Sequence, residues 1–222
     1  HFPGNVAAYD IASAAHRGKG DDERALAADE AALQLDRSSA RINRLARTLA
    51  GSGAGGRAVA ILEEWLVEQP GDGPGWANLA MIRQQLGRAD EALDAYERAV
   101  PLVDPNPVLL NNMAWLYLDR DGERAVELAT EAYRLAPSRA EIVDTYGWVL
   151  FQQGRKEEGL AALQQALIIA PRNAEIALHV AEALTDLQRG DEARPMLERV
   201  IRDNPGSPFA ESARALLSGS SG

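Results

Sequence analysis

The 222-residue sequence contains no cysteine, which excludes disulfide bonds and thiolate-bound metal centres. Its three histidines include no pair four residues apart that would present two ring nitrogens on one helix face. No run approaches the roughly 20 apolar residues that a membrane-spanning helix needs, and the longest candidate is the short segment 166–170. The sequence therefore gives no reason to expect a metal, a cofactor or a membrane span.

Signatures of catalysis are also missing. The sequence has no phosphate-binding loop, no dinucleotide fingerprint and no nucleophile elbow. The glycine-rich run at 51–56 lacks the Lys-Ser/Thr pair of a phosphate loop, and we interpret it as a loose turn or hinge. No set of residues combines a nucleophile, a base and a group that orients the base. We predict that the chain is not an enzyme.

Positive charge is scarce relative to negative charge. There are 23 Lys and Arg against 33 Asp and Glu, so the formal net charge is −10, and only two of the basic residues are lysines. A surface with this balance repels phosphate backbones, which argues against a nucleic-acid partner. A basic or neutral partner suits it better.

The two ends of the chain carry no targeting signal. The first residue is not Met, no basic segment precedes an apolar one, and residues 218–222 resemble a linker or a tag. We expect the chain to be a fragment whose targeting signals lie elsewhere.

What the sequence does contain is a repeat of about 34 residues. Pro137, Pro171 and Pro205 are each 34 residues apart, and Asp104 stands 34 residues after Pro70. An amphipathic segment precedes each of these marks, with apolar or small residues at i, i+4 and i+7, the period of a helix with one buried face. A second helical stretch lies upstream of each, across a turn with a glycine suited to a positive φ. These glycines are Gly20, Gly53, Gly87, Gly122, Gly154 and Gly190.

The pattern predicts six helix pairs and a terminal capping helix. The predicted boundaries are 1–38, 39–72, 73–106, 107–139, 140–173 and 174–206 for the pairs, 207–217 for the cap and 218–222 for the tail. One pair cannot bury its apolar stripe alone, so stability must come from stacking neighbours. Small residues near the start of each second helix are expected to let the paired helices approach closely. They are Ala58, Ala92, Ala125, Gly159 and Ala193.

These units resemble tetratricopeptide repeats. The third unit shows the family pattern in Trp76, Leu79, Ala80, Gly87 and Tyr96, whereas the first unit is the weakest match. The resemblance implies an all-α, right-handed superhelical solenoid of about six repeats. It also implies a concave groove, lined by the first helices, that binds a protein or peptide segment.

A narrower resemblance lies in the fourth and fifth units. Segments 109–118 and 142–154 are similar to the repeat lipoproteins encoded with bacterial exosortase and exopolysaccharide systems. This resemblance implies a scaffold in the periplasm or on the outer membrane, held by a lipid anchor outside this fragment. A cytoplasmic location stays open.

The family pattern places the candidate binding residues on the inner face of the fourth and fifth units. They are Asn111, Asn112, Trp115, Asp144, Trp148 and Phe151. Trp115 and Trp148 fall at the same position of neighbouring units and would form an aromatic strip, a usual anchor for a peptide or a sugar ring. The alternative is that both indoles are core residues between first helices. We expect His179, which has no second histidine nearby, to be structural.

The leading hypothesis is a protein-binding scaffold. Two alternatives remain: direct binding of a polysaccharide by the aromatic strip, and a recognition arm of a larger enzyme such as a glycosyltransferase. A self-assembling array is a further possibility, because cut solenoids expose unsatisfied end faces.

Overall fold

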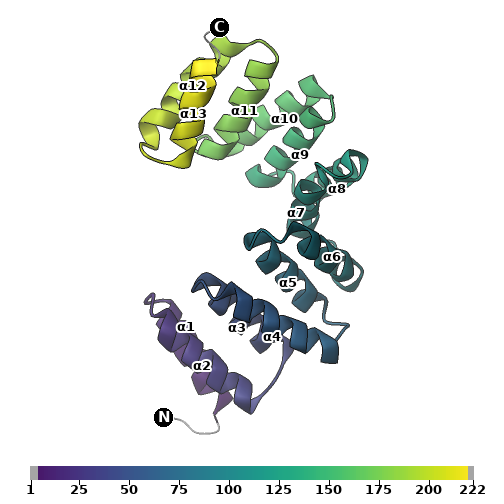
Figure 1. Cartoon of the computed structure of the whole chain (residues 1–222), viewed down its shortest axis with the longest axis vertical. Coiled ribbons are helices and arrows are strands. Elements are labelled where there is room, and N and C mark those ends of the chain that lie inside the picture. Colours follow the sequence, from purple (N-terminus) through teal and green to yellow (C-terminus); the bar gives the residue numbers. More distant parts are fainter. Residues whose placement is uncertain (1–4, 220–222) are drawn as a thin grey trace. The chain divides into compact units, whose positions relative to one another are not determined.

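The computed structural model describes residues 5–219, which form thirteen α-helices, one short 3₁₀ helix and no strand (Figure 1). The helices are Val6–Arg17 (α1), Asp22–Leu35 (α2), Ser39–Gly51 (α3), Gly55–Glu68 (α4), Gly73–Gln85 (α5), Ala89–Ala99 (α6), Pro107–Tyr117 (α7), Gly122–Leu135 (α8), Ala140–Gln152 (α9), Lys156–Ile169 (α10), Ala174–Asp186 (α11), Gly190–Asp203 (α12) and Pro208–Gly219 (α13). Among them, none is both long enough and apolar enough to cross a lipid bilayer.

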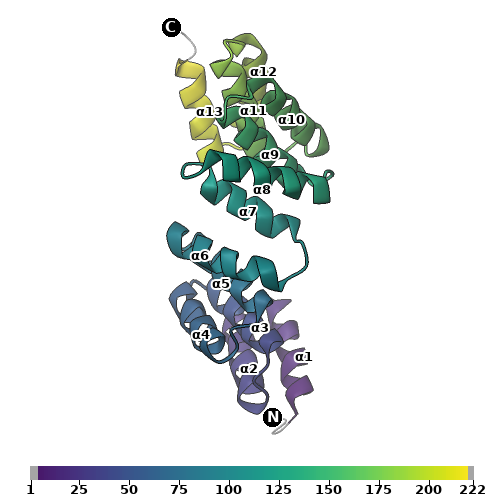
Figure 2. The same ribbon diagram turned by 90° about the vertical axis from the view of Figure 1, so that its right-hand side faces the viewer.

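The chain divides into two compact units, His1–Pro105 and Asn106–Gly222. In the first unit α1 packs on α2, α3 on α4 and α5 on α6; α3 also contacts α5. In the second unit the pairs are α7 with α8, α9 with α10 and α11 with α12, and α9 contacts both α7 and α11. The last helix, α13, lies against α11 and α12 (Figure 2). Stacked helix pairs confirm the predicted all-α solenoid class.

Prolines follow the second helices as the spacing predicted. α4, α8, α10 and α12 each end two residues before Pro70, Pro137, Pro171 and Pro205 respectively. Proline lacks the amide hydrogen that a continuing helix needs, so the chain must leave the helix there. α6 differs, because a 3₁₀ turn over Val100–Leu102 follows it. The predicted cap begins with Pro208 in the first turn of α13, which reaches Gly219; the last three residues of the predicted tail lie outside the described residues.

The expected role of the turn glycines is correct for four of the six. Gly20, Gly53, Gly87 and Gly154 have φ between 70° and 82°. The expectation was wrong for Gly122 and Gly190, which are the first residues of α8 and α12. In the turn before α12 the positive φ, 61°, belongs to Gln188 instead.

The glycine-rich run at 51–56 was expected to form a loose turn or hinge, but much of it belongs to the ends of two helices. α3 ends at Gly51 and α4 begins at Gly55, which leaves three residues between them. The amide of Ala54 donates to the carbonyl of Leu49 at 2.8 Å, so the turn is closed by a hydrogen bond. A Cβ added to Gly55 would lie 2.9 Å from Leu86, which shows that this glycine packs against the next repeat.

Close approach of paired helices depends on small side chains. Ala58, Ala92, Ala125 and Ala193 are at most 1% exposed. The closest approach is in the second unit, between α9 and α10. A Cβ on Gly147 would lie 2.7 Å from the amide nitrogen of Leu163, and a Cβ on Gly159 would lie 2.6 Å from the carbonyl oxygen of Gly147. Backbone meets backbone here, so no flexible side chain can move aside.

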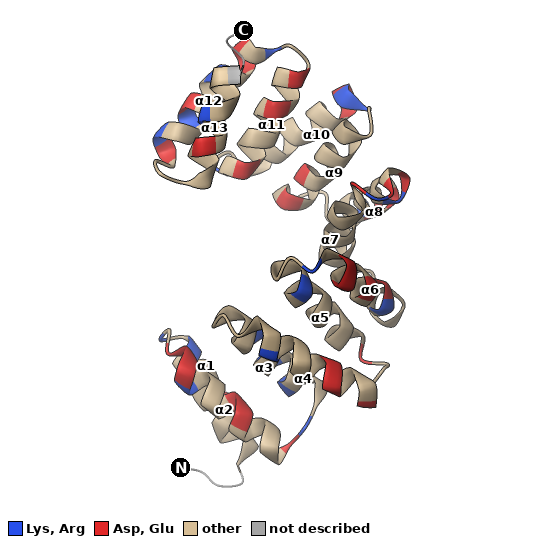
Figure 3. Cartoon of the chain, viewed as in Figure 1, with Lys and Arg blue, Asp and Glu red and all other residues tan. Residues whose placement is uncertain are grey.

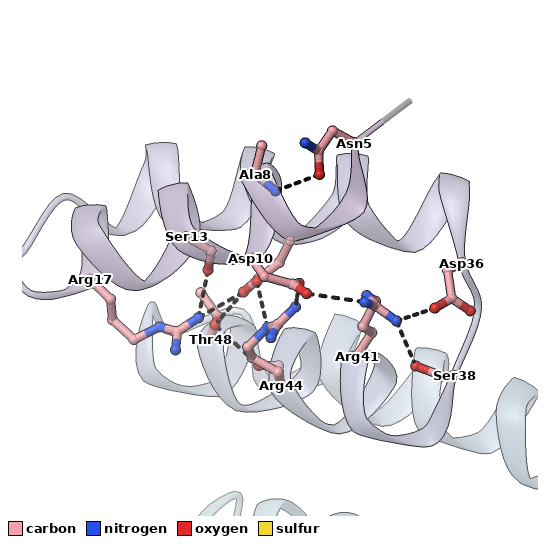
Figure 4. Close-up of polar contacts among 11 residues, drawn as sticks. Asn5, Ala8, Asp10, Ser13, Arg17, Asp36, Ser38, Arg41, Arg44 and Thr48 are labelled. Atoms are coloured by element: carbon pink, nitrogen blue, oxygen red, sulfur yellow. Dashed lines mark hydrogen bonds and ion pairs between the residues drawn. The ribbon is translucent and has the colours of Figure 1, made fainter. Parts of the chain in front are cut away.

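Ion pairs and hydrogen bonds tie the first helix pair to the second (Figure 4). Asp29 of α2 is 2% exposed and accepts hydrogen bonds from Arg17 of α1 at 2.9 Å and from Arg44 and Thr48 of α3 at 2.9 and 3.0 Å. Removing one member of a buried, paired network leaves an uncompensated charge, which is strongly destabilising.

The same network includes Asp10 of α1, which accepts hydrogen bonds from Arg41, at 3.0 Å, and from Arg44 (Figure 4). Ser13 is the one buried residue of α1, so α1 itself buries no apolar side chain fully. Burial opposes ionisation of Asp10, but the hydrogen bonds and charges of Arg44 and Arg41 outweigh it and hold its pKa below 3.8.

A Gly147→Ala substitution is expected to lower the free energy of unfolding by about 1–3 kcal/mol, because the added methyl group meets the α10 backbone. The matched control is Gly56→Ala in α4, where a Cβ meets nothing within 4 Å. That control should gain roughly 0.5–1 kcal/mol from the higher helix propensity of alanine. Urea unfolding followed by circular dichroism measures both, and equal stabilities would contradict the proposed backbone contact.

An Asp10→Asn substitution should cost stability near pH 7 and progressively less in acid. The pKa of Asp10 is lowered in the folded state, so its contribution is present above the ordinary value of 3.8 and is lost as the pH falls through the folded-state pKa. Thermal unfolding of both proteins, at neutral pH and below that value, tests this. A difference in melting temperature that does not shrink in acid would show that the charge of Asp10 is not what stabilises the network.

Candidate partner-binding site

Three aromatic rings from the first helices of the second unit lie together. Trp115 is on α7, Trp148 on α9 and His179 on α11. The imidazole of His179 stacks on the Trp148 indole with ring centroids 4.7 Å apart and an interplanar angle of 21°. The Trp115 indole lies 6.0 Å from the same imidazole at 31°. We call these three residues the aromatic stack. His179 thus links the two tryptophans that the sequence predicted to form a strip.

The two indoles differ in burial. Trp115 is 41% exposed, more than any other aromatic side chain among the described residues. Trp148 is partly buried and packs against the core cluster of the second unit. Trp115 is therefore a surface residue, as expected for an aromatic strip, whereas Trp148 is largely a core residue between first helices.

A buried carboxylate holds the imidazole in place. The Nδ1 atom of His179 lies 2.8 Å from Oδ2 of Asp144, and the side chains are 13% and 8% exposed. Burial of His179 acts to lower its pKa, but the hydrogen bond and charge of Asp144, with the charges of Glu175 and Glu182, raise that pKa above 6.5. A charge-assisted contact of this kind fixes ring orientation as well as protonation.

The contact between Asp144 and His179 has a counterpart in the first unit. Asn78 of α5 donates from its side-chain amide to Oδ1 of Asn43 on α3 at 3.1 Å and to the Asn43 carbonyl at 3.0 Å. Both contacts join residues 35 apart in the sequence. This offset is one residue longer than the repeat. It is the signal that could have identified His179 as the partner of Asp144, whereas we expected His179 to be an isolated structural residue.

The remaining predicted residues lie around the stack. Phe151 is 6% exposed and its ring lies 6.1 Å from that of Trp148, so it supports the stack from the core and offers a partner little surface. Asn111 and Asn112 on α7 are partly buried. The Oδ1 atom of Asn111 and the Oδ1 atom of Asp144 are buried and accept no hydrogen bond from the described residues.

The arrangement suits binding rather than metal coordination. Within residues 5–219 no group of three or more His, Asp or Glu side chains is placed to hold a metal ion. The aromatic stack instead leaves one indole, that of Trp115, 41% exposed. Flat rings bury a large area at a small entropic cost, which is why indoles are common in recognition sites.

Family models of the tetratricopeptide repeat match residues 74–102, 112–174 and 150–217, which together are more than half of the chain. This is a chain of tetratricopeptide repeats. Among solved structures, a tetratricopeptide repeat protein from Parabacteroides merdae superposes with a TM-score of 0.76 at 14% identity, over 97% of this chain and 91% of that one. The structure of YrrB, described as a tetratricopeptide repeat protein with an unusual peptide-binding site, gives a TM-score of 0.65 at 17% identity over 84% and 97%.

A curated relative is the cytochrome c-type biogenesis protein CycH of Rhizobium meliloti. It is 30% identical over 132 residues, which cover 56% of this chain and 35% of CycH. The chain thus matches about a third of the length of that relative. The structural likenesses, at under 25% identity, establish the fold of the repeats.

An Asp144→Asn substitution is expected to lower the pKa of His179, because burial of the imidazole is then no longer outweighed by a hydrogen-bonded carboxylate. NMR titration of the imidazole in both proteins measures the change. In the wild type, proton binding by His179 stabilises the fold below pH 6.5, and this contribution is lost as the pH rises through the folded-state pKa. An unchanged titration would show that Asp144 does not control the ring.

Proposed function

We propose that the chain is a protein-interaction module that binds a segment of a partner on the face formed by α7, α9 and α11. The observation that carries the proposal is the exposed Trp115 indole beside an imidazole that Asp144 and Trp148 hold in place. Most large apolar side chains of this fold are buried between the stacked repeats. An indole left 41% exposed on a pre-organised support is the usual form of a binding hot spot.

The comparisons support the same class of function. The YrrB structure is described as having a peptide-binding site, and its repeats superpose on those of this chain.

The partner determines the biological context, for which we propose two candidates. The resemblance of segments 109–118 and 142–154 favours an envelope scaffold with a lipid anchor, working with an exopolysaccharide system. The match to part of CycH favours the partner-binding region of a longer protein in cytochrome c-type biogenesis. Identifying the bound segment distinguishes these contexts, because the first predicts a secretion component and the second a protein of cytochrome maturation.

Replacing Trp115 by alanine should weaken binding of a selected peptide by about 2 kcal/mol or more, without unfolding the chain, because the indole is largely at the surface. Peptides are first selected from a random displayed library against the wild-type chain, and their affinities are then measured by calorimetry. Phe209→Ala is the matched control, since Phe209 is 39% exposed on α13, outside the face. Trp148→Ala is expected to lose both affinity and stability, because Trp148 packs against the core.

Equal affinities of wild type and Trp115→Ala for every selected peptide would remove the stack from the binding site. Saturation-transfer NMR with exopolysaccharide fragments covers the glycan alternative. Transfer to the fragments in wild type but not in Trp115→Ala would replace the peptide by a sugar as the ligand.

A further inference from the structure

The face that carries the aromatic stack has charge of one sign. α7, α9 and α11 contain no Lys or Arg, and their acidic residues are Glu141, Asp144, Glu175, Glu182 and Asp186. Figure 3 shows acidic positions and no basic ones along α9 and α11. The corresponding helices of the first unit, α1, α3 and α5, carry five arginines: Arg17, Arg41, Arg44, Arg47 and Arg83. The acidic character is therefore particular to the second unit and is not a general property of first helices.

Two of these carboxylates act on the stack and are themselves unpaired. Glu175 and Glu182 stand four residues before and three residues after His179, so all three lie on one face of α11. After the hydrogen bond and charge of Asp144, both carboxylates act to raise the pKa of His179, as expected from their place on the same helix face. Glu175 is exposed and Glu182 partly buried, and neither side chain forms an ion pair or hydrogen bond within the described residues.

Of the other acidic residues on these helices, Asp144 and Asp186 are paired, whereas Glu141 of α9 is exposed and has no ion pair within the described residues. Asp144, from α9, is paired with His179, so that pair has no net charge when the imidazole is protonated. Asp186, at the end of α11, is paired with Lys156. α7 contributes Trp115 and no charged side chain. Glu175 and Glu182 are therefore the uncompensated charges on the helix that carries His179, and with Glu141 they give this face a negative charge.

The first unit contains an internal example of an indole and two glutamates that bind one arginine, with all three residues on one helix, α4. The Arg37 guanidinium lies over the Trp65 indole, 5.8 Å from its centroid, and pairs with Glu64 and Glu68 at 2.8 Å each. An indole with two glutamates one helical turn apart thus accepts one arginine in this same chain. A cation over an indole face is attracted by the ring quadrupole, and carboxylates beside it add charge-assisted hydrogen bonds.

We propose that the aromatic stack, with Glu175 and Glu182, binds a cationic side chain, an arginine or a lysine, of the partner segment. The inference rests on the proposed function, because it names the chemistry of the residue that the partner-binding face receives. The stack supplies the indole face of Trp115, and the two glutamates supply the counter-charge. A partner segment of basic character also complements the net charge of −10 of the chain.

The test begins with the same random displayed peptide library, panned against the wild-type chain. Peptides whose binding depends on Trp115 should be enriched in Arg and Lys relative to the unselected library. Replacing the enriched arginine of such a peptide by citrulline, which keeps its shape and removes its charge, should weaken binding on the order of tenfold.

The protein side of the test uses the double variant Glu175→Gln with Glu182→Gln, which keeps the side-chain shapes. Its affinity for the arginine peptide should fall by a similar factor, whereas its affinity for the citrulline peptide should stay unchanged. Glu198→Gln is the matched control, because Glu198 is exposed on α12, outside the face, and should leave both affinities unchanged.

The outcomes separate the two proposals. Selected peptides that need Trp115 but show no preference for Arg or Lys, or that bind the double variant as well as wild type, would overturn the cationic anchor and leave the partner-binding face intact. If no selected peptide depends on Trp115, the binding face itself is wrong and the cationic anchor fails with it.

Discussion

Close contact between helix backbones is the constraint on which the rest of the structure depends. Each helix pair can bury its apolar stripe only if its two helices nest, and they nest because a small residue stands where they cross. Alanine serves in most pairs, whereas Gly147 and Gly159 bring α9 and α10 together without any intervening side chain. Pairs of fixed thickness then stack so that the first helices α7, α9 and α11 lie in consecutive order. Residues one repeat apart are thereby placed side by side.

The candidate site is a product of this stacking. Trp115, Trp148 and His179 come from three different helices. The two tryptophans occupy the same place in their repeats, and His179 stands three places earlier in the next repeat. The side chains of the stack are held by their neighbours. Trp148 packs against Phe151 and the core cluster, and Asp144 contacts the imidazole of His179. Recognition can therefore reside in a few side chains on a face whose backbone is set by packing elsewhere.

The sequence predicted the fold well because its signals are periodic. The proline spacing located the ends of four second helices, and the small residues marked the crossings. Local turn chemistry was less predictable, since Gln188 rather than Gly190 takes the positive φ. The site was predicted in part. Trp115, Trp148 and Asp144 follow from repeat position, but the role of His179 depends on contacts across repeats, which a single helix pattern does not contain.

The hydrogen bonds that join residues 35 apart bear on how such an array can grow. Asn43 with Asn78, and Asp144 with His179, each place one partner in one repeat and the other partner in the next. The apolar faces of the repeats are similar, so one repeat could pack in place of another. The polar pairs are specific to two particular neighbouring repeats. Duplication or loss of a single repeat would separate a donor from its acceptor and bury one of them alone. Lineages that lengthen or shorten the array are therefore expected to change repeats in blocks that keep these partners adjacent.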